Sequence, residues 1–142
     1  MTNATSWSLQ VPDAAIEAIR AHGAQTYPDE CCGALLGPRQ GEIVEAFALP
    51  NETSGERRRR FLIGPEEYRA AERRATETAQ ELLGFYHSHP DHPAIPSTFD
   101  LEHAWPNLSY IIVSVKKGTA AEMRSWRLKT DRSGYDEEQI LT

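Results

Sequence analysis

The sequence has little cysteine, no long apolar stretch and no export signal. Only two of its 142 residues are cysteine, which excludes the small secreted folds that depend on several disulfides. Its best apolar run, residues 110–115, is much shorter than the roughly 18 residues of a membrane-spanning helix. The first residues have neither the basic nor the apolar region of a secretory signal. We therefore expect a cytoplasmic protein without a membrane span, in which residues 1–142 form a single domain.

The sequence also has fewer basic than acidic residues. Lys and Arg number 15 against 21 Asp and Glu, a net charge of −6. Because such a chain is repelled by a phosphate backbone, nucleic acid is excluded as the main partner. Four arginines nevertheless follow one another from Arg57 to Arg60. This run is either a solvated loop or a basic patch that steers an acidic protein partner, and the sequence leaves both readings open.

The two cysteines, Cys31 and Cys32, are neighbours in the chain. A disulfide between adjacent residues is strained, so we expect free thiols in a reducing compartment. Neither cysteine belongs to a C-x-x-C pair, which excludes a structural zinc site built on sulfur.

Alternating strand and helix patterns indicate an α/β domain with a mixed central sheet and about three helices. Helices are expected over residues 12–25, 65–83 and 97–105; the second has apolar residues at three- and four-residue steps and ends at Gly84. Strands are expected over residues 8–11, 31–36, 43–49, 85–89, 108–115 and 121–128, with shorter candidates at 59–63 and 139–141.

Metal-binding residue types gather in the stretch from residue 85 to residue 100. His87 and His89 are two positions apart on an extended segment, so their imidazoles project to the same side. Asp100 follows in the first turn of the short helix, which a proline-bearing loop could fold back over the strand end. Two imidazoles and a carboxylate form a three-ligand zinc set, and the open fourth position is typical of a catalytic site.

Each part of this pattern also has an ordinary structural reading. An isolated His-x-His is common on protein surfaces without any metal. Residues 97–100 form a capping box with Ser97 as the N-cap, a reading that is compatible with a metal-binding Asp100. His92 is a third imidazole nearby, but its spacing does not follow the strand.

Hydrolysis also needs a base that takes a proton from the attacking water. Among several carboxylates, Glu30 stands out because it adjoins the buried apolar run 31–36. A desolvated carboxylate there would have the raised pKa of a proton shuttle. The alternative is a strand-end charge that faces solvent.

These residues together resemble a known motif. In chain order they are Glu30-x-x-Gly33, His87-x-His89-Pro90 and Ser97-x-x-Asp100, which resembles the JAMM motif of MPN-domain (JAB) metallopeptidases. The segments 28–37 and 110–114 are similar to the compact prokaryotic branch, and the resemblance covers residues 8 to 130.

The resemblance implies a single MPN domain of the JAB/cytidine-deaminase-like fold. It also implies that His87, His89 and Asp100 bind Zn²⁺. In addition it makes Glu30 the general acid/base and Ser97 a hydrogen-bond donor to the developing oxyanion.

The implied activity is that of a zinc metallopeptidase. The bond that such an enzyme would hydrolyse is a peptide or isopeptide bond at the C-terminal tail of a ubiquitin-like protein or a sulfur-carrier protein of the ThiS/MoaD type. Residues 100–108 leave no room for the long second insertion of eukaryotic deubiquitinating members, which favours carrier processing. Two other functions stay open, a zinc hydrolase of small amides and a non-catalytic MPN scaffold that binds a protein partner.

Overall fold

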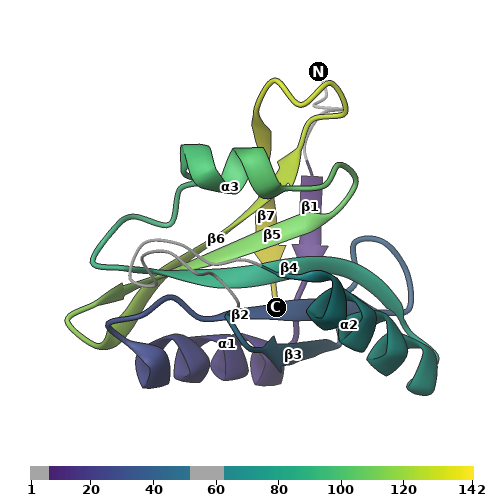
Figure 1. Cartoon of the computed structure of the whole chain (residues 1–142), viewed down its shortest axis with the longest axis horizontal. Helices are drawn as coiled ribbons and strands as arrows, with labels where there is room; N and C mark the ends of the chain where they lie inside the picture. The colour runs from purple at the N-terminus through teal and green to yellow at the C-terminus, as the bar shows by residue number, and fades with distance from the viewer. Residues whose placement is uncertain (1–6, 52–62) are drawn as a thin grey trace.

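The computed structural model describes residues 7–51 and 63–142, and within them a mixed seven-stranded sheet carries three helices (Figure 1). In chain order the elements are β1 Trp7–Gln10, α1 Asp13–Thr26, β2 Cys32–Gly37, β3 Glu45–Leu49, α2 Pro65–Glu77, β4 Glu81–Pro90, α3 Thr98–His103, β5 Ser109–Lys116, β6 Thr119–Leu128 and β7 Tyr135–Leu141. The strand order is β1-β7-β6-β5-β4-β2-β3, with β1–β7 and β4–β5 parallel. The expected α/β class is therefore confirmed.

The central strands are buried on both faces, so alternate residues enter different cores. Leu35, Tyr86 and Ile111 pack with Ile19 of α1 in one cluster. Their neighbours in the chain pack with α2 in the other cluster, as Phe85 does with Ala71. Helices α1 and α3 lie on opposite sides of the sheet (Figure 1). Because His87 and His89 are two and four residues after Phe85, they face the α2 side.

Gly33 lies where two strands approach closely. A Cβ atom at this position would overlap the ring of Tyr86 on the neighbouring strand. The Tyr86 hydroxyl in turn lies 2.7 Å from Nδ1 of His22 in α1. Gly33 thus serves packing rather than chemistry, because only a residue without a side chain lets the Tyr86 ring cross β2.

The helix expected over residues 65–83 is wrong at its C-terminal end. Helix α2 ends at Glu77, and Ala79 adopts the left-handed conformation with φ 56°. Leu82 pairs instead with Leu36 of β2, within β4. The residues after Thr78 suit a helix by composition, but pairing with β2 outweighs that local preference.

Other expectations hold with shifted boundaries. Strand β3 begins two residues later than residue 43, and the C-terminal strand is longer than 139–141 because β7 pairs with both β1 and β6. The run from Arg57 to Arg60 lies outside the described residues, as does nearly all of the strand expected at 59–63. Cys31 and Cys32 are buried and form no disulfide, as expected. Within the described ranges, the structure has no helix with the length and hydropathy of a membrane span.

Candidate metal centre

The site is built from the end of β4 and the start of α3. His87 and His89 point to one side of β4 because successive side chains of a strand alternate. Asp100 is held over them by a capping box with Ser97, as the sequence indicates. The Ser97 backbone N–H donates to Asp100 Oδ2 at 2.8 Å, and the Asp100 N–H donates to Ser97 Oγ at 3.1 Å. Local helix-capping chemistry therefore fixes the direction of the carboxylate.

Three potential ligand atoms converge at this point. His87 Nε2 and His89 Nε2 are 3.1 Å apart, and each lies 3.2 Å from Asp100 Oδ2. All three side chains are buried. In a tetrahedral site with bonds of about 2.0–2.1 Å, ligand atoms are separated by roughly 3.3 Å. The three atoms thus have nearly the spacing that a single ion requires.

The protonation of the cluster also suits a cation. His89 Nδ1 lies 2.8 Å from the carbonyl oxygen of Pro93, which only accepts, so Nδ1 carries the proton and the Nε2 lone pair faces the cluster. Burial lowers the pKa of His87, which favours its neutral form. Burial acts to raise the pKa of Asp100, but the adjacent imidazoles outweigh it and hold that pKa well below its usual range. A neutral His87 beside an ionised Asp100 fits a divalent metal ion.

Glu30 lies beside this cluster, just before β2. Its side chain is only 4% exposed, so the solvent-facing reading is wrong. Its Oε1 has no hydrogen-bond partner among the described residues. Burial and the negative charge of Asp100 raise the pKa of Glu30 from 4.5 to about 9. With His89 and Ser97 it lines a cavity of about 310 Å³, where a buried carboxyl group can exchange a proton with bound water.

Ser97 is exposed at the mouth of the same cavity. Its Oγ accepts from the Asp100 N–H, whereas its own proton has no acceptor among the described residues. The hydroxyl can therefore cap the helix and at the same time donate to a bound molecule.

The other histidines lie outside the donor cluster. His92 is exposed and lines the cavity of Glu30 without belonging to the metal-competent group. His22 contacts Tyr86, and His103 lies on α3 with Nδ1 2.9 Å from the carbonyl oxygen of Phe99.

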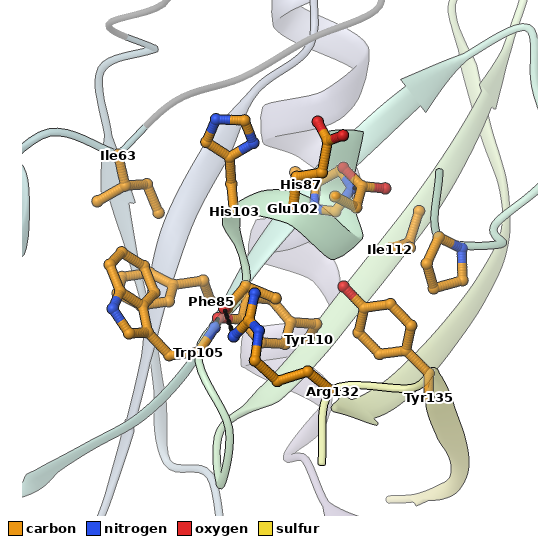
Figure 2. A pocket seen from close by; sticks show the side chains of 13 residues that line it. Ile63, Phe85, His87, Glu102, His103, Trp105, Tyr110, Ile112, Arg132 and Tyr135 are labelled. Carbon is orange, nitrogen blue, oxygen red and sulfur yellow. Dashed lines mark hydrogen bonds and ion pairs between the residues drawn. The ribbon is translucent and has the colours of Figure 1, made fainter. Parts of the chain in front are cut away.

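A second cavity, of about 380 Å³, reaches the cluster from the side of His87 and Asp100 (Figure 2). Part of its wall comes from Trp105 and Tyr135, which sequence reasoning missed. No motif marks these residues, because the cavity depends on how β7 and the segment after α3 meet in space.

Two imidazoles, a carboxylate and a buried carboxyl group on a mixed sheet form a centre of the metallohydrolase type. Residues 12–129 match the model of the prokaryotic homologs of the JAB domain, and the chain belongs to this family. The resemblance to JAMM/MPN proteins is thereby confirmed.

Two curated relatives extend this comparison. The chain is 32% identical over 110 residues to desampylase of Haloferax volcanii, covering 77% of this chain and 79% of the relative. It is 34% identical over 115 residues to CysO-cysteine peptidase of Mycobacterium tuberculosis, covering 80% and 77%.

Solved structures agree on the fold. A protein from Desulfitobacterium hafniense superimposes with a TM-score of 0.81 at 32% identity, over 94% of this chain and 91% of that one. A JAB1/MPN domain protein from Archaeoglobus fulgidus gives 0.59 at 20% identity, over 94% and 100%. The expected MPN fold is confirmed.

Proposed function

We propose that this protein is a zinc-dependent peptidase that cleaves a peptide or isopeptide bond at the C-terminal tail of a ubiquitin-like or sulfur-carrier protein, with residues 1–142 acting as one domain. The observation that carries the proposal is the convergence of His87, His89 and Asp100 beside the buried Glu30. The names of the relatives, a desampylase and a CysO-cysteine peptidase, support the substrate class.

His87, His89 and Asp100 are the proposed zinc ligands. Zinc bound there would supply Lewis acidity and an acidified water at neutral pH. The protein keeps its ligands oriented in advance, since the Pro93 carbonyl fixes the ring of His89 and the capping box fixes Asp100.

Glu30 is the proposed general acid/base. Its position beside His89 and Ser97 allows it to take a proton from water and return it to the leaving amine. A raised pKa of Glu30 suits the return of the proton to the leaving amine, because a weaker acid holds the proton until the amine needs it. A bound cation would lower the pKa of Glu30 towards neutrality, which suits the removal of a proton from the attacking water.

Ser97 is proposed to donate its hydroxyl proton to the oxyanion of the transition state. Loss of a helix cap alone costs about 0.5–2 kcal/mol of stability, whereas loss of an oxyanion donor costs about 10²–10³-fold in kcat. We expect Ser97→Ala to show the larger kinetic loss, and Ser97→Thr, which keeps a hydroxyl, to retain most of the activity. Thermal melting and kcat measured on the same samples separate the two roles. A variant that is only less stable, with normal kcat, would restrict Ser97 to capping.

The direct test of the function uses a ThiS/MoaD-type carrier extended by one cysteine beyond a C-terminal Gly-Gly. Intact-mass measurement should show removal of the cysteine, loss of this activity with a chelator, and recovery on adding zinc. If the carrier stays intact while short peptide amides are cleaved, the protein is a small-amide hydrolase. If it binds the carrier tightly and cleaves neither substrate, it is a scaffold.

A further inference from the structure

Two separate cavities reach the metal-binding cluster from different sides. One contains Glu30 and His89, and the other contains His87 and Asp100; they share no lining residue. Since Glu30 is proposed to return a proton to the leaving amine, the leaving group belongs on its side. The tail of the carrier is the acyl portion of the substrate. It then lies along the second cavity.

One wall of the second cavity is aromatic, and the rest of the lining includes Asp100, Glu102 and Arg132 (Figure 2). Trp105 and Phe85 have ring centroids 5.9 Å apart, and Phe85 and Tyr110 are 6.3 Å apart. Tyr135 continues the row at 6.4 Å from Tyr110, and Ile112 also lines the cavity. With its volume of about 380 Å³, the cavity has the size and lining that apolar ligand groups prefer.

Hydrogen bonds hold this wall in place without a ligand. The Trp105 backbone N–H donates to the Tyr110 hydroxyl at 2.7 Å. Arg132 donates from Nη1 to the Ala104 carbonyl at 2.8 Å and from Nη2 to the Leu101 carbonyl at 3.2 Å. Two guanidinium nitrogens are thus engaged by the end of α3, which holds the segment of Trp105 against the turn before β7.

Tyr135 adds one polar group to these walls. Its hydroxyl is directed into the cavity (Figure 2) and has no hydrogen-bond partner among the described residues. Burial and the charge of Asp100 raise its pKa, so the hydroxyl stays protonated and can donate. Tyr135 is the first residue of β7 and lies beyond the 12–129 family match, whereas the other three aromatic residues of the wall lie within it.

We propose that this cavity binds the first apolar side chain upstream of the cleavage site, and that the Tyr135 hydroxyl donates to a carbonyl oxygen of the same segment. The proposal rests on the proposed peptidase function. If the residues at the cleaved bond are Gly-Gly, they carry no side chain, so the preceding residue is the first that can fill the cavity. An extended chain advances about 3.3–3.6 Å per residue, which places that side chain past the metal ligands and towards the aromatic walls.

The test compares cysteine-extended carriers that carry Leu, Gly or Asp immediately before Gly-Gly. The kcat/KM of the Leu carrier should exceed that of the other two by about 10–100-fold. In Trp105→Ala this preference should shrink to a few-fold. Trp7 provides a matched control because it is 43% exposed, close to the 41% of Trp105, and lies outside the cavity. Trp7→Ala should therefore keep the full preference.

Tyr135→Phe removes only the hydroxyl group. It should lower kcat/KM about tenfold for all three carriers while the preference for Leu persists, because the ring still forms the wall. Equal cleavage of the Leu, Gly and Asp carriers by the parent protein would overturn this inference and leave the peptidase function intact. A preference for Asp would also overturn it. Failure to cleave any of the tails would reject both proposals.

Discussion

Glu30→Gln should lower the turnover of a cysteine-extended carrier by about 10²–10⁴-fold while the bound metal is retained. Glutamine has nearly the same shape but cannot take a proton from water, and Glu30 is not among the three converging ligand atoms. Metal content by elemental analysis and single-turnover rates on one preparation give both results. Glu17→Gln, at an exposed position of α1, is the matched control and should behave as the parent. Full activity in Glu30→Gln would assign the base to another group.

Glu30→Gln should also change how the stability of the metal-free protein depends on pH. The pKa of Glu30 is about 9 in the folded chain and 4.5 as the ordinary value, so the folded state holds this proton more tightly than the unfolded state. This contribution to the free energy of unfolding is fully present below pH 4.5 and is lost as the pH rises towards about 9. Metal-free Glu30→Gln should therefore melt at a higher temperature than metal-free parent at pH 8, with the difference shrinking near pH 4. Denaturation at both pH values measures it, and a variant that is less stable at pH 8 would contradict it.

Asp100→Asn and His87→Asn should each remove the metal and lower turnover on the order of 10³-fold or more, because water activation and charge stabilisation are lost together. His92→Ala is the control for metal binding, since His92 is a nearby imidazole outside the donor cluster. Its metal content should equal that of the parent. If His92→Ala or Cys32→Ser loses the metal while Asp100→Asn keeps it, the ligand assignment is wrong.

Much of the fold follows from local patterns in the chain. The unbroken apolar run of β2 needed no tertiary information, and both β2 and α1 lie within one residue of their expected bounds. The C-terminal end of α2 could not be found in this way. Residues 78–83 have helical composition, and only the presence of β2 as a partner makes Glu81–Leu83 part of a strand.

Some features of the candidate site also follow from local sequence patterns, and others depend on tertiary contacts. Strand alternation brings His87 and His89 together, and a capping box visible in the sequence directs Asp100 towards them. The burial of Glu30 also agrees with its place beside an apolar run, whereas its catalytic role and that of Ser97 stay predictions. The aromatic cavity had no local signal. Trp105 and Tyr135 meet there only because the end of α3 packs against the turn before β7, a contact that depends on the whole strand order.

A stoichiometric activity titration tests the central claim most directly. Metal-free protein at a known concentration receives increasing zinc, and the rate of cysteine removal from the extended carrier is followed by intact mass. A single catalytic zinc held by His87, His89 and Asp100 predicts a linear rise that reaches its plateau at one zinc per chain. In Asp100→Asn the same titration should stay flat. A rate that is independent of zinc, or equal activation of the parent and Asp100→Asn, would contradict the account.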